Sequence, residues 1–173
     1  GDGDFNYHEI VSSDKALSSA GMHHFILEYP GKHDWPAPEI VRDVLWWFEF
    51  DAYRRDPSIR QKTIIRSYMA SVKQQSELLE ESKDPFGAVQ NLEKGIAFLT
   101  GIARTTSFQK KRDELVKSPE YKHFMRQKQK AMMLEKRLQQ GYMIAFRDKD
   151  TLWWSNEIDV LNEKTSRLEN AFM

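Results

Sequence analysis

The sequence predicts a mainly α-helical protein, an irregular helical bundle that follows a short α/β segment with a single β-strand. From residue 38 onward, helix start signals recur and apolar residues are spaced three and four apart. Residues 1–38, in contrast, contain half of the glycines, half of the prolines and one short apolar run. The change in composition near residue 38 therefore separates two kinds of structure.

Composition limits the classes of function. The chain has 173 residues, with 26 Lys or Arg, 26 Asp or Glu and no Cys. The balanced charge argues against a nucleic acid or an anionic membrane surface as a partner, and no apolar run approaches the ~20 residues of a membrane span. The lack of Cys excludes disulfides, thiolate zinc sites and cysteine nucleophiles. The sequence predicts no cofactor, and its aromatic content of 12% predicts a folded chain.

Prolines mark the beginnings of several helices. Asp56-Pro57, Asp84-Pro85 and Ser118-Pro119 each place a capping oxygen directly before a proline at the first helical position. Glycine at position 101 is suited to end a helix, and the serine at 107 to cap the next one. The resulting prediction is six helices, over residues 38–55, 57–82, 85–100, 107–117, 119–147 and 151–173.

The last two predicted helices carry apolar stripes at helical spacing. The stripe on 119–147 consists of Phe124, Ala131, Leu134, Leu138, Tyr142 and Ala145. The stripe on 151–173 consists of Trp154, Ile158, Leu161, Leu168 and Phe172. Such a stripe stabilises a helix only where a neighbour covers it. Because short loops make consecutive helices antiparallel neighbours, the pattern predicts a bundle.

Residues 22–29 (MHHFILEY) have the features of a buried β-strand. The run is short, apolar and rich in β-forming residues, and Gly21 and Pro30-Gly31 bound it. A short helix over residues 14–20 is expected before it. A strand needs a hydrogen-bonded neighbour, so this segment presupposes strands outside the chain. We therefore expect its open edges to pair with a second copy, giving a homodimer through residues 22–29.

The strongest candidate for a chemical role is His33, in the loop formed by residues 31–36 (GKHDWP) after the predicted strand. Open α/β sheets place reactive groups at the carboxyl ends of their strands, and imidazole is a general base near neutral pH. Taken alone, a single His is more often structural. His23 and His24 are adjacent in the predicted strand, so they face opposite sides and cannot hold one metal ion together.

Residues 1–53 resemble the C-terminal end of an α/β-hydrolase of the serine esterase type, in the group of feruloyl-esterase-like and polyhydroxybutyrate-depolymerase-like enzymes. In that family an acidic residue, a helix, the last strand, a loop with the pattern G-x-H-x-W and a closing helix follow one another. The corresponding parts here are Asp4 in GDFNY, with Asp2 as a rival, the helix near 15–19, strand 22–29, the GKHDWP loop and the helix containing Leu45-Trp46-Trp47-Phe48.

The resemblance implies that Asp4 and His33 are the acid and the histidine of a Ser-acid-His triad. The nucleophile is missing, because none of the serines lies in a G-x-S-x-G motif. Residues 1–55 would then be the C-terminal remnant of a hydrolase domain, not catalytic alone, with a missing N-terminal hydrolase core as its partner. Residues 56–173 would be a helical extension for docking or oligomerisation. The resemblance also favours a periplasmic or extracellular location, although the residues themselves leave the compartment open.

A non-enzymatic helical protein-interaction module is the alternative function. The two functions differ in one geometric expectation. A hydrolase remnant brings Asp4 within hydrogen-bonding distance of His33 and leaves the imidazole edge open toward a missing neighbour. In an interaction module, His33 is instead enclosed by other side chains or faces solvent far from any acid.

Overall fold

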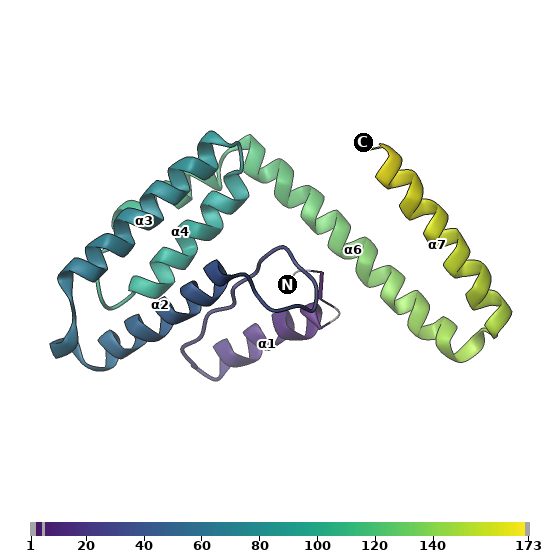
Figure 1. Ribbon diagram of the computed structural model, residues 1–173, viewed down its shortest axis with the longest axis horizontal. Helices are drawn as coiled ribbons and strands as arrows, with labels where there is room; N and C mark the ends of the chain where they lie inside the picture. Colours follow the sequence, from purple (N-terminus) through teal and green to yellow (C-terminus); the bar gives the residue numbers. More distant parts are fainter. Residues whose placement is uncertain (1–2, 5, 172–173) are drawn as a thin grey trace. The chain divides into compact units, whose positions relative to one another are not determined.

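The structure is a computed structural model that describes residues 3–4 and 6–171, with side chains up to residue 164. It is mainly helical, as predicted (Figure 1). The elements in chain order are α1 (Tyr7–Ser19), α2 (Pro38–Arg55), the short 3-10 helix η1 (Pro57–Ile59), α3 (Lys62–Glu81), α4 (Pro85–Leu99), α5 (Thr106–Leu115), α6 (Pro119–Asp148) and α7 (Thr151–Ala171).

The predicted β-strand at residues 22–29 is not present. These residues form an irregular segment, and the described part of the chain contains no β-strand at all. The physical reason is that a strand forms only against another strand, and none is available here. Part of the segment packs on the helical core instead, although Met22 is 58% exposed. Phe25, for example, lies against Phe98 of α4 with ring centroids 5.3 Å apart. The strand remnant in the predicted fold class is therefore wrong for this structure.

The proline signals place the helix starts well. Asp84 accepts the backbone N–H of Gly87 at 2.8 Å, and Ser118 accepts that of Tyr121 at 3.1 Å. The third signal gives a different result, because the carboxylate of Asp56 accepts the N–H of Ser58 at 2.9 Å and closes only the 3-10 turn η1. Extended backbone at residues 60–61 then separates η1 from α3. The helix predicted over 57–82 is therefore two elements.

The core of the helical bundle is built around α4, which contacts both α3 and α5 along its length and also packs on α2. Seven residues of α4 are buried, and they include Leu92, Phe98 and Leu99. The core side chains from α2, α3 and α5 are Phe50, Tyr53, Ile65, Tyr68, Val72 and Phe108. Gly95 permits the close approach of α3, because a Cβ there would lie 2.7 Å from Val72 Cγ1.

Two arginines join the end of α2 and the turn after it to the end of α4. Arg54 donates from Nε to the carbonyl of Thr100 at 3.0 Å and from Nη2 to that of Phe98 at 2.8 Å. Arg60 donates to the carbonyl of Tyr53 at 2.8 Å and to that of Gly101 at 3.0 Å. Gly101 has φ +76°, the left-handed conformation expected after a helix end. The last carbonyl groups of α4 are thus satisfied by charged donors.

The chain forms two compact units, Gly1–Lys122 and His123–Met173. The first contains α1 to α5, and the second consists of most of α6 together with α7. The boundary predicted between residues 55 and 56 lies inside the first unit. That boundary separates regions by their resemblance to a hydrolase, so it stays a prediction. In the part of the chain that the structure describes, no helix is both long and apolar enough to cross a membrane.

Candidate functional site

The structure brings Asp4 and His33 together. Nδ1 of His33 lies 2.8 Å from Oδ2 of Asp4, although 29 positions separate them in the sequence. The Asp4 side chain is 10% exposed and that of His33 is 66% exposed. An ionised carboxylate only accepts hydrogen bonds, so the imidazole donates its Nδ1–H in this contact. This is the contact that the hydrolase resemblance predicts. The rival acid, Asp2, lies outside the described residues.

A local turn holds the Asp4 carboxylate in place. Its Oδ1 accepts the backbone N–H of Asn6 at 2.8 Å, and its backbone carbonyl accepts the N–H of Tyr7 at 3.0 Å. The second bond begins α1, so the helix starts at Tyr7. The start near residue 14 that the sequence predicts is therefore wrong. The N–H of Asn6, and then the imidazole of His33, lower the pKa of Asp4 below its ordinary value. The carboxylate is therefore ionised at neutral pH.

The loop that carries His33 is attached to the same turn by its backbone. The N–H of Gly3 donates to the carbonyl of Gly31 at 2.8 Å. Within the loop, the N–H of Asp34 donates to the carbonyl of Lys32 at 2.9 Å and tightens the chain around His33. A Cβ at Gly3 would lie 3.1 Å from the carbonyl oxygen of Gly31, so glycine allows this close approach. Two independent contacts thus fix the position of Asp4 relative to His33.

The arrangement can do part of the chemistry of acyl transfer. A carboxylate bonded to Nδ1 orients an imidazole and stabilises its protonated form, and Nε2 is then the nitrogen that exchanges the proton of a nucleophile. The nucleophile and its oxyanion-hole amides are a separate requirement. Since no serine of this sequence lies in a G-x-S-x-G motif, two of the three triad roles have candidates here.

His23 and His24, which lie close to the candidate site in the sequence, have structural contacts. His24 lies 2.8 Å from the carbonyl of Met22 through Nδ1 and 3.0 Å from Asp14 Oδ1 through Nε2. These acceptors, the carbonyl first, raise the pKa of His24. His23 stacks on Trp47, with ring centroids 4.5 Å apart, and burial lowers its pKa. The described residues contain no group of three or more side chains suited to a metal ion.

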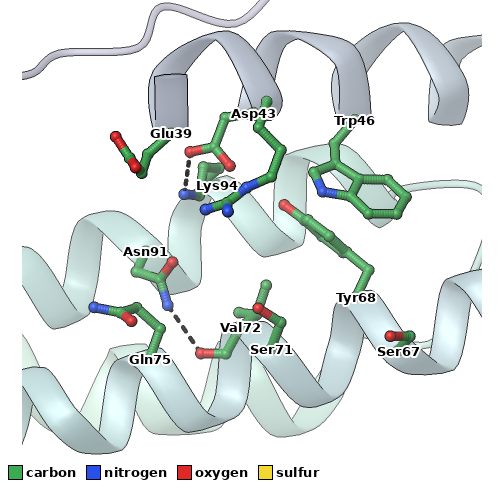
Figure 2. A pocket seen from close by; sticks show the side chains of 11 residues that line it. Glu39, Asp43, Trp46, Ser67, Tyr68, Ser71, Val72, Gln75, Asn91 and Lys94 are labelled. Carbon is green, nitrogen blue, oxygen red and sulfur yellow. Dashed lines mark hydrogen bonds and ion pairs between the residues drawn. The ribbon is translucent and has the colours of Figure 1, made fainter. Parts of the chain in front are cut away.

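A second candidate site is a polar groove of about 470 Å³ between α2, α3 and α4 (Figure 2). Its Asp43 and Lys94 form an ion pair at 2.6 Å, and the Asn91 amide donates to the carbonyl of Val72 at 2.8 Å. Figure 2 shows that these groups come from three different helices. The two contacts link α2 to α4 and α4 to α3, which is a structural role. Sequence reasoning missed the groove because 51 positions separate the members of its ion pair.

Comparisons with known proteins do not assign the chain to a family. No family model matches the sequence, and the searches of curated proteins and of solved structures found no match either. The geometry of Asp4 and His33 therefore has to carry the functional argument without a relative.

Proposed function

We propose that this chain supplies the acid and the histidine of a serine hydrolase active site, with Asp4 and His33 in these roles. The observation that carries the proposal is the 2.8 Å contact between Asp4 Oδ2 and His33 Nδ1. The sequence around it supports the same conclusion, because residues 31–36 carry the G-x-H-x-W pattern of the serine esterases that residues 1–53 resemble. The chain is then the C-terminal part of a carboxylic-ester hydrolase, followed by a helical extension.

In this function the proton moves through His33. Nε2 takes the proton of the serine hydroxyl while the serine oxygen forms its bond to the carbonyl carbon of the ester. The protonated imidazole is stabilised by Asp4 and then donates the proton to the leaving alcohol, which produces an acyl-enzyme. A water molecule repeats the sequence, and its proton passes through the same nitrogen while the acid is released. The serine belongs to the hydrolase core, which this sequence does not include.

The hydrolase core is the partner that this proposal requires, and α2 offers a surface for it. Val41, Val44, Leu45 and Phe48 recur at the spacing of one helix face, and each of them is exposed. The opposite face of α2 contributes Phe50 and Tyr53 to the core. A helix with apolar residues on both faces is normally covered on both. Residues 22–29 would gain the missing strand partner in the same assembly. Pairing of this segment between two copies of the chain is the other possibility.

The test uses the complete gene product that contains this sequence. We expect it to hydrolyse p-nitrophenyl butyrate and to react at one serine with a fluorophosphonate. The change Asp4→Asn should lower kcat by about 10⁴, since the imidazole loses the carboxylate that fixes its tautomer. The change His33→Ala should lower kcat at least as much.

The matched control is His24→Ala, because His24 also contacts an aspartate, at 3.0 Å, but lies outside the proposed triad. This variant should keep its kcat. The proposal fails if the complete gene product neither hydrolyses the ester nor reacts with the fluorophosphonate, or if His33→Ala is as active as the control.

A non-enzymatic helical interaction module is the second candidate. It is favoured by the exposed apolar residues of α2 and by similar residues on α6 and α7. An inactive complete gene product with a stable protein partner would support this function over the hydrolase.

A further inference from the structure

The second unit has apolar side chains that its own two helices do not cover. Leu134 and Leu138 of α6 are 56% and 48% exposed, and Ile158 of α7 is 52% exposed. All three belong to the apolar stripes of these helices, with members three and four residues apart. In an antiparallel pair of helices, such stripes would normally face each other and be buried.

Contacts between α6 and α7 are gathered next to the turn that joins them. The hydroxyl of Tyr142 lies 2.8 Å from Glu157 Oε1, and Trp154 packs on both Tyr142 and Phe146, with ring centroids 5.8 and 4.5 Å apart. These contacts join the two helices beside the turn. Alongside them lies a groove of about 470 Å³, lined on α6 by Leu138 and Ala145 and on α7 by Trp153.

The two helices carry opposite charge. Helix α6 has seven Lys or Arg against three Asp or Glu, and α7 has two against four. Such a pair favours contact of α6 with an α7 and disfavours contact of like helices. A two-fold arrangement of two copies provides this contact twice, α6 on α7 of the partner and the reverse.

We propose that residues 123–171 bind a second copy of themselves, so that two α6–α7 pairs form an antiparallel four-helix bundle. The stripes that contain Leu134, Leu138 and Ile158 form its core, and the basic α6 of each copy lies beside the acidic α7 of the other. A unit of about 50 residues with only two helices rarely has a sufficient core alone, and association is a common remedy. This inference does not depend on the hydrolase proposal.

Sedimentation equilibrium of the full chain tests the proposal. We expect a dimer, and we expect Leu138→Glu to raise its dissociation constant at least about 100-fold, because two carboxylates enter the apolar core of each dimer. Met143→Glu is the matched control, since it adds the same charge to α6 at a residue that is 71% exposed and off the stripe. It should leave the dissociation constant within about threefold of the original.

Three results would contradict the proposed dimer of α6–α7 pairs. A full chain that stays monomeric at high concentration, with the stripes covered from within, overturns the proposal. Equal weakening by Leu138→Glu and Met143→Glu also overturns it, because the effect would then come from charge alone. A dimer that Leu138→Glu leaves intact would use another surface, such as residues 22–29, and would overturn it as well.

Cross-linking gives a second readout that does not require a disruptive substitution. The sequence has no Cys, so single cysteines can be placed at will. We expect a bismaleimide to join Leu138→Cys in one copy to Ile158→Cys in another when the two variants are mixed. A mixture with Met143→Cys in place of Leu138→Cys should give little product. Equal yields from the two mixtures would contradict the proposed bundle.

Discussion

The carboxylate of Asp4 bonds both to its own turn and to the distant loop that carries His33. Its two oxygens accept from different groups, Oδ1 from the N–H of Asn6 and Oδ2 from the imidazole of His33. The N–H of Asn6 has the larger effect on the pKa of Asp4. Resemblance to the hydrolase motif could predict the contact with His33. It could not predict the contact with Asn6, because that depends on the backbone conformation of the turn before α1.

The pKa of Asp4 gives a residue-scale prediction. In His33→Ala it should rise, since one of the groups that favour the charged form is gone, but it should stay below the ordinary value of about 3.9 because the Asn6 N–H remains. Carboxyl carbon shifts in an NMR titration measure this value. The control His24→Ala should leave the pKa of Asp4 unchanged. An unchanged value in His33→Ala would mean that the two side chains do not bond in solution.

The direction in which pH changes the stability of the protein follows from the lowered pKa of Asp4. The folded-state pKa of Asp4 lies below its unfolded value, so its contribution to stability is present above pH ~3.9 and is lost as the pH falls through the folded value. His24 acts in the opposite direction, because its folded-state pKa is raised. Its contribution is present below its unfolded pKa of about 6.5 and is lost as the pH rises through the folded value.

At the scale of elements, helix starts were the most predictable feature. Asp84-Pro85 and Ser118-Pro119 act locally, so the capping bonds form wherever the helix forms. The strand prediction at 22–29 failed for a related reason, because a strand depends on a neighbour that the local sequence does not supply. The attachment of α2 to α4 by Arg54 was not predictable either, since its acceptors lie 44 and 46 positions away.

Arg54 provides the element-scale prediction. Its guanidinium bonds to the last carbonyls of α4 and lies over the ring of Trp47, 5.2 Å from the centroid. Arg54→Ala should lower the free energy of unfolding by about 2 kcal/mol, because charged donors to the last carbonyls of α4 are lost. Chemical denaturation measures this change in the free energy of unfolding. Arg55→Ala is the control, since the Arg55 side chain is 75% exposed and bonds only to Asp51 among the contacts described, and it should cost less than about 0.5 kcal/mol.

At the scale of the whole molecule, the division into two compact units predicts separate responses to a core substitution. Leu92 is 2% exposed in the core of the first unit. Leu92→Ala should destabilise that unit by about 3 kcal/mol through loss of buried area and the cavity left behind. Hydrogen exchange should therefore accelerate at α4 amides and stay the same after residue 123. Leu78→Ala, at a residue that is 50% exposed, is the control. Equal acceleration in both units would mean that they unfold as one.

The sequence by itself determined the helical class, most helix starts and the candidate pair Asp4 and His33. Capping and apolar spacing act over a few residues, and a chemical motif can be recognised from the residue types and their order. Only the tertiary structure decided that residues 22–29 are not a strand, that Arg54 closes the end of α4, and that Asp43 pairs with Lys94. Each of these depends on groups that are distant in the chain, and their meeting is set by the packing of α2, α3 and α4 rather than by any local preference.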